Sequence, residues 1–151
     1  MIDREIELPA GAIRVAPLEE RVEGSIAFPN SMWNGQQVED LVLTFLAGKV
    51  VTIKATRGVE AVKAELEAAG TAGHSFREFA MGFNPLLAIP EDKPWIPYYG
   101  YGAGVVRLSL GDNSELGGNV EGGYVRWNFF TDATVRVGQE VWVEDGKLLN
   151  K

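Results

Sequence analysis

The most distinctive group of chemically capable residues lies in segment 93–102, where Trp95, Tyr98, Tyr99 and Tyr101 cluster. Two prolines and flanking glycines predict an irregular loop here rather than a strand. Because proline limits backbone freedom, the rings can be presented to a ligand at low entropic cost. We expect these four aromatic residues to form a wall over a ligand pocket or a contact surface for another protein. The alternative is that the rings pack on a sheet face, as large aromatic side chains usually do.

Few other side chains suggest catalysis or cofactor binding. The chain has no cysteine, which excludes disulfides and thiolate chemistry. Its one histidine, His74, precedes Ser75, but adjacency in sequence is not the geometry of a nucleophile and its base. Acidic residues in the glycine-rich segment 111–123 do not have the spacing of an EF-hand loop. We therefore expect no cofactor and no calcium site.

Composition limits the class of partner and the location of the protein. A formal net charge of −7 argues against nucleic acid and anionic membrane as main partners. No apolar run approaches the roughly 20 residues of a membrane-spanning helix. The charged run Asp3-Arg4-Glu5 lies close behind Met1, unlike the start of a secretory signal. We expect a cytoplasmic protein in which residues 1–151 form a single domain.

The spacing of apolar residues predicts mainly β-strands. Alternation at Leu41, Leu43 and Phe45, followed by the apolar run 50–53, predicts a hairpin with Ala47-Gly48 in its turn. A second hairpin is expected around Asp145-Gly146, and further strands over 22–28, 105–110 and 124–130. Val59, Val62, Leu66 and Ala69 share one face of a helix that Gly70 can terminate. The predicted fold class is α+β: a mostly antiparallel β-sheet or partly closed barrel with one packed α-helix.

Several short motifs, in order along the chain, resemble a known family. Leu8–Ala12, the hairpin region 41–51, Glu78–Pro85 with the pattern Glu-x-x-x-Gly-x-Asn-Pro, Gly111–Asn113 and Asp145–Leu148 carry the resemblance. Together they resemble the C-terminal domain of the aminopeptidase T-like (thermophilic-type) metallopeptidases, a family that also includes dioxygenase relatives. The resemblance runs from about Leu8 to Leu148.

The resemblance also implies that most metal ligands have been replaced. Where the family carries Glu, His and His-x-Asp, this chain has Ala12, Arg107, and Arg126 with Asn128, whereas Glu78 retains a carboxylate. Arginine stays protonated and offers no lone pair to a metal ion. We therefore predict no metal site and no metallo-aminopeptidase activity.

If the family geometry is kept, Glu78, Arg107, Arg126 and Asn128 lie near one another. The two guanidinium groups could bind a carboxylate or phosphate, and Glu78 could act as a general base. The alternative is that these charges form an internal salt bridge, since buried charge must be compensated.

Two classes of function remain open. The first is a cofactor-free enzyme acting on a small anionic or peptide-like substrate by acid–base chemistry, namely cyclisation, isomerisation or hydrolysis. Glu78 would be catalytic, and Arg107, Arg126, Asn128 and the four aromatic residues would bind the substrate. The alternative is a non-catalytic pseudo-peptidase that serves as a ligand-binding or protein-assembly module. Because family members act as dimers, we expect a homodimer or a complex with a partner chain.

Overall fold

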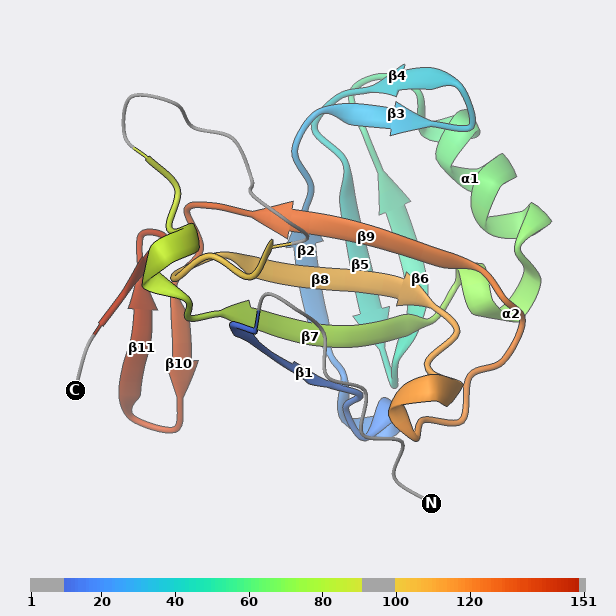
Figure 1. Ribbon diagram of the computed structural model, residues 1–151. Helices are drawn as coiled ribbons and strands as arrows, with labels where there is room; N and C mark the ends of the chain where they lie inside the picture. The colour runs from blue at the N-terminus through green and yellow to red at the C-terminus, as the bar shows by residue number, and fades with distance from the viewer. Residues whose placement is uncertain (1–9, 91–99, 150–151) are drawn as a thin grey trace. The chain divides into compact units, whose positions relative to one another are not determined.

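The computed structural model describes residues 10–90 and 100–149, and it consists mostly of antiparallel β-sheets with one main helix (Figure 1). Within these residues the sheets are not closed into a barrel. The predicted fold class is therefore confirmed. The chain packs as two compact units, which we call the first unit (Met1–Val15, Phe79–Leu108, Phe129–Lys151) and the second unit (Ala16–Glu78, Ser109–Asn128).

The second unit contains the predicted central hairpin. Strands β5 (Val42–Leu46) and β6 (Lys49–Lys54) pair antiparallel, and β2 (Gly24–Ala27) pairs with the other side of β5. Ala47 and Gly48 have positive φ angles of 48° and 76°, the conformation that a tight two-residue hairpin turn requires. The alternating apolar residues thereby direct Leu43 and Phe45 into the core.

A smaller hairpin in the second unit joins β3 (Ser31–Trp33) to β4 (Gln36–Val38). Its turn residues Asn34 and Gly35 again have positive φ angles, of 43° and 74°. The turn places Trp33 in the core, where it is fully buried and contacts Phe28 edge to face at 6.0 Å between ring centroids.

The main helix is α1 (Val59–Ala68), as the spacing of its apolar residues predicted. It buries Ala61, Val62 and Leu66, and Figure 1 shows it beside the β3–β4 hairpin of the same unit. Gly70, with a φ of 60°, follows its end and begins the short helix α2 (Gly70–Gly73). No helix among residues 10–90 and 100–149 combines the length and apolar character that spanning a membrane requires.

A four-stranded sheet has the order β1-β7-β8-β9. Its strands are β1 (Ala12–Val15), β7 (Phe76–Gly82), β8 (Val106–Gly111) and β9 (Val125–Phe130). Strands β1 and β7 pair antiparallel from Ala12↔Gly82 to Val15↔Phe79. Strands β7, β8 and β9 each contribute residues to both units. Strand β7 was not predicted, because nearly all its residues are buried and its sequence does not alternate.

A three-stranded sheet completes the first unit. Its order is β10 (Val135–Val137), β11 (Glu140–Glu144) and β12 (Lys147–Leu148). Asp145 and Gly146 form the predicted turn, with φ angles of 46° and 74°. Short 3-10 turns, labelled η, are formed by Glu19–Arg21, Pro85–Leu87 and Ser114–Leu116.

Candidate functional site

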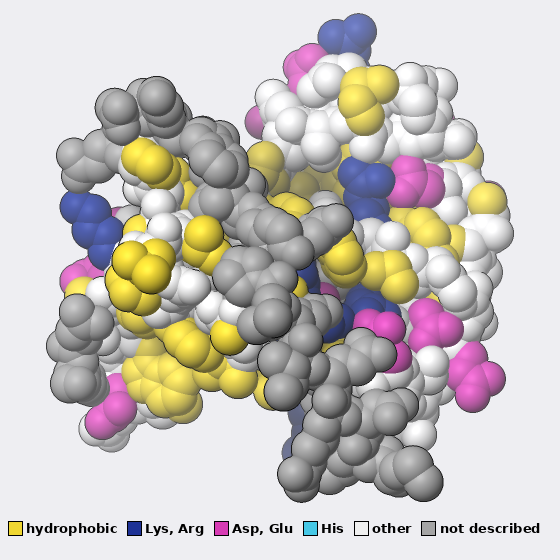
Figure 2. All heavy atoms as spheres, viewed as in Figure 1, with side chains coloured by type: hydrophobic (Ala, Val, Ile, Leu, Met, Phe, Trp, Pro, Cys, Tyr) yellow, Lys and Arg dark blue, Asp and Glu magenta, His cyan; other side chains and the backbone are white. Residues whose placement is uncertain are grey.

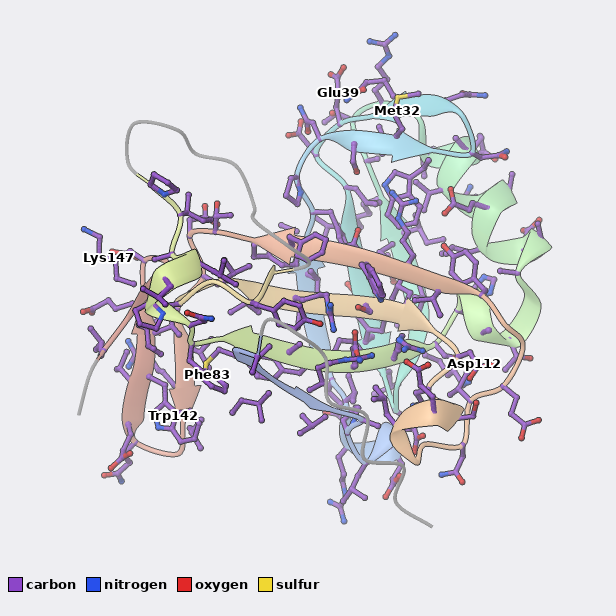
Figure 3. All side chains as sticks on the ribbon, viewed as in Figure 1. Met32, Glu39, Phe83, Asp112, Trp142 and Lys147 are labelled. Carbon is purple, nitrogen blue, oxygen red and sulfur yellow. The ribbon has the colours of Figure 1, made fainter. Side chains whose placement is uncertain are left out.

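Arg126 on β9 is held by three interactions within the second unit. Its Nη1 donates to Glu65 Oε1 at 2.8 Å, and its Nη2 donates to the Met32 carbonyl oxygen, also at 2.8 Å. Its guanidinium carbon lies 3.4 Å from the ring centroid of Trp33, a cation–π contact. Met32, labelled in Figure 3, lies on β3. Arg126 therefore connects β9 to the β3–β4 hairpin, through Met32 and Trp33, and to α1, through Glu65.

Glu65, on α1, is the acceptor at the centre of this cluster. Its Oε1 also accepts from the Tyr124 hydroxyl at 2.8 Å, and its Oε2 accepts from the backbone N–H of Asn34 at 2.6 Å. Burial, followed by the hydrogen bond to Glu65, raises the pKa of Tyr124 well above its usual range. The hydroxyl therefore remains a donor throughout the physiological pH range. We refer to Arg126, Glu65, Tyr124, Trp33 and the Asn34 N–H as the Glu65 cluster.

Glu78 lies on β7 and is fully buried. The Ser109 hydroxyl donates to its Oε1 at 3.1 Å, and Arg77 Nε is 3.9 Å from the same oxygen. Arg77 is buried as well and also pairs through Nη2 with Glu115, whose side chain is 61% exposed. The Glu78 carboxylate is therefore enclosed beside a cation of its own strand.

The other polar residues expected at the site are also buried. Arg107, on β8, is 3% exposed, and Asn128, on β9, is 8% exposed. Asn128 Nδ2 donates to the Arg126 carbonyl oxygen at 3.5 Å, which places these two predicted residues side by side. Arg107 belongs to the first unit, whereas Glu78, Arg126 and Asn128 belong to the second.

Of the four aromatic residues in segment 93–102, only Tyr101 lies among the residues that the structure describes. Trp95, Tyr98 and Tyr99 lie outside the described residues. Tyr101, in the first unit, is 5% exposed, and its carbonyl oxygen accepts from the Asn84 N–H at 3.1 Å. Tyr101 is therefore buried among the described residues, and a role of the four aromatic residues in binding stays a prediction.

A second polar cluster, which the sequence analysis did not identify, surrounds the loop after β8. Asn113 is fully buried, donates to Glu19 Oε1 at 3.1 Å and accepts from the Val120 N–H at 2.8 Å. A hydrogen bond from the backbone of Asn119, with further ones from its side chain and Asn113, lowers the pKa of Glu19 to about 2. The Gly111–Asn113 motif of this loop entered only through the family resemblance, and nothing local in the sequence pointed to Glu19.

Asp112, labelled in Figure 3, accepts hydrogen bonds from other residues of the same loop. Hydrogen bonds from the Ser114 side chain first, and from the backbone of Gly123, Ser114 and Gly122, lower its pKa below the usual range. Its carboxylate is thus committed to backbone and hydroxyl donors of the loop. Among residues 10–90 and 100–149, no three His, Cys, Asp or Glu side chains are grouped so that they could hold a metal ion.

Comparison with known proteins identifies the family. The thermophilic metalloprotease (M29) family matches residues 4–87, which are 84 of the 151 residues, and the chain belongs to this family. The predicted family resemblance is confirmed. The match includes Glu78 but ends before Arg107, Arg126 and Asn128, so their correspondence to metal ligands stays a prediction.

Among the solved structures that resemble the chain are the following two. One is 2,5-dihydroxypyridine dioxygenase from Pseudomonas putida KT2440, with a TM-score of 0.73 and 14% identity over 95% of this chain and 44% of that one. The other is wild-type AmpT from Thermus thermophilus, with a TM-score of 0.47 and 22% identity over 69% of this chain and 26% of that one. The chain thus spans less than half the length of either protein. No curated protein matches the sequence. The dioxygenase match establishes a shared fold and nothing about the reaction.

Proposed function

We propose that this chain is a metal-independent member of the M29 family that acts as a ligand-binding or assembly module rather than as a metallopeptidase. The observation that carries this proposal is the engagement of Arg126, at a position where the family resemblance implies a metal ligand. Both of its Nη groups hydrogen-bond within the second unit, and its guanidinium lies over Trp33. A positive charge held in this way contributes to the fold.

The residues at the expected ligand positions do not suit a divalent cation. Two-metal sites use several carboxylate or imidazole ligands, which neutralise the charge of the ions. Arg107 and Arg126 have no lone pair to donate and repel cations, and Ala12 has no donor in its side chain. Glu78 alone retains an anionic oxygen, and that oxygen faces Arg77 and Ser109.

The acid–base enzyme hypothesis is less favoured by the surroundings of Glu78. A general base must come within hydrogen-bond reach of the proton that it removes. The Glu78 side chain is 0% exposed. Its contacts with Ser109 and Arg77 support a buried structural pair, in which each charge compensates the desolvation of the other.

We further propose that residues 1–151 act as one domain in the cytoplasm, as a homodimer or with a partner chain. The exposed apolar side chains of the first unit support an interface, because exposed apolar clusters commonly mark one. Phe83, Leu86 and Val137 are 43%, 91% and 47% exposed. Figure 2 shows apolar side chains gathered over the β10–β11 hairpin of this unit.

Native mass spectrometry of the purified chain tests this proposed function. The protein is measured as purified, after incubation with Zn²⁺, Mn²⁺ or Co²⁺, and after incubation with EDTA. We expect no stoichiometric metal in any sample, together with a dimer mass, an organic adduct, or both. One or two tightly held metal ions per chain would overturn the metal-independent assignment.

A further inference from the structure

Three hydrogen-bond donors converge on one carboxylate in the Glu65 cluster. They are Arg126 Nη1 and the Tyr124 hydroxyl, both 2.8 Å from Oε1, and the Asn34 backbone N–H, 2.6 Å from Oε2. The donors come from β9, the residue before it, and the turn between β3 and β4. Both oxygens of the carboxylate are therefore bound, and one donor is a permanent cation.

The same three donors would suit a carboxylate from outside the chain. Arg126 is positioned independently of Glu65, because its Nη2 bonds the Met32 carbonyl oxygen and its guanidinium stacks on Trp33. The Asn34 N–H is fixed by the tight turn of its hairpin. The Tyr124 hydroxyl can donate because a tyrosine hydroxyl is protonated at neutral pH.

The cluster is also within reach of solvent. The side chains of Arg126 and Glu65 are 19% and 18% exposed. By contrast, the Arg77–Glu78 pair is almost completely enclosed, at 3% and 0%. Glu65 is attached to α1 by a flexible side chain, so it can rotate into water without unfolding the helix. A ligand could take its place.

We propose that Arg126, Tyr124 and the Asn34 N–H form a carboxylate-binding site, which Glu65 occupies as an internal competitor until a free carboxylate displaces it. This inference rests on the proposed binding function and names its ligand class, a small carboxylic acid or the C-terminal carboxylate of a peptide. Glu65 lowers the apparent affinity because its carboxylate is tethered beside the site at a high effective concentration. The site is therefore selective for ligands that have contacts beyond the carboxylate.

The test titrates the wild-type chain and Glu65→Ala with three probes: acetate, N-acetyl-dialanine and N-acetyl-dialanine amide. Isothermal calorimetry gives the affinity, and the NMR shift of the Asn34 amide reports occupancy at the site. We expect saturable binding of both acids to Glu65→Ala, with the Asn34 signal returning toward its wild-type position. The wild-type chain should bind the same acids about tenfold or more weakly, and the amide should bind neither protein. Tighter binding of the peptide acid than of acetate would identify a peptide C-terminus, and equal binding a small acid.

Two further variants complete the test, one as a control and one as a substitute for Glu65→Ala. Glu39→Ala removes the carboxylate of a surface pair with Arg57 that has 39% and 67% exposed side chains, and it should acquire no carboxylate site. Glu65→Ser removes the carboxylate and shortens the side chain so that it no longer reaches the three donors, and it replaces Glu65→Ala if that variant does not fold. The proposal is overturned if the folded Glu65 variant binds no acid at the Asn34 amide, or if the wild-type chain shows no binding at all. Metal in the native mass spectrum would instead refute the proposed function, so the two failures can be told apart.

Discussion

Replacing Arg126 by alanine should destabilise the protein by about 3 kcal/mol. The change removes two hydrogen bonds, to Glu65 and to the Met32 carbonyl oxygen, and the contact with Trp33. Hydrogen bonds to charged groups contribute about 1.5–3 kcal/mol each, and a cation–π contact about 0.5–2 kcal/mol. These contributions sum to about 3.5–8 kcal/mol, and we expect a loss just below that range, since about a fifth of each charged side chain is exposed and solvent weakens the contacts. Glu65 also keeps Tyr124 and Asn34 as donors.

Urea unfolding followed by circular dichroism measures the loss in the free energy of unfolding. Thermal unfolding measures the corresponding change in Tm. At about 2–4 °C per kcal/mol for a protein of this size, Tm should fall by about 6–12 °C. Arg57→Ala is the matched control, because Arg57 also pairs with a glutamate at 3.2 Å but is 67% exposed. Its loss should cost less than about 1 kcal/mol. If Arg126→Ala loses no more stability than Arg57→Ala, the guanidinium does not support the fold and our reasoning is wrong.

Two further predictions concern other parts of the chain. The pKa of Glu19 falls from 4.5 to about 2, chiefly through the backbone hydrogen bond from Asn119, so the unfolded chain binds more protons between these pH values. The stability contributed by Glu19 is complete above pH 4.5 and is lost toward pH 2. In acid-unfolding curves, the free energy of unfolding of Glu19→Gln should therefore fall less steeply over this window than that of the wild-type chain. Equal slopes would contradict the role given to Glu19. Gly104→Ala should cost at least about 2 kcal/mol, because φ is +90° and the new Cβ would lie 1.9 Å from the Gly146 carbonyl oxygen. Gly117→Ala is the control that separates backbone strain from the steric clash, since φ is +82° there but no atom lies within 4 Å of the new Cβ. If Gly117→Ala loses as much stability as Gly104→Ala in the same unfolding assay, the clash is unimportant.

Local patterns predicted the hairpins and the helix because their determinants are close in sequence. The turns at Ala47-Gly48 and Asp145-Gly146 lie between alternating apolar residues, and both adopt the positive φ angles expected of them. The face of α1 was likewise visible from its spacing. Strand β7 was missed because Arg77 and Glu78 lie buried within it, where a half-buried strand would expose one of two neighbours.

The partners of the candidate site could not be predicted from the sequence in the same way. From the sequence, Glu78 was a candidate for the carboxylate that neutralises an arginine, whereas Arg126 pairs with Glu65, 61 residues away. Glu65 was not among the residues that the sequence singled out as candidates for the site. Its role depends on how β9, α1 and the β3–β4 turn pack together, and no local pattern encodes that arrangement.

The most direct test of metal independence compares the free energy of unfolding in EDTA with that in excess Zn²⁺, Mn²⁺ or Co²⁺. A metal that binds only the folded state stabilises it by about 2.7 kcal/mol at a concentration 100 times its Kd. We predict the same unfolding free energy in all four solutions, because the arginines at the expected ligand positions cannot coordinate a cation. A concentration-dependent rise with any one metal would contradict our account and restore the metallopeptidase interpretation.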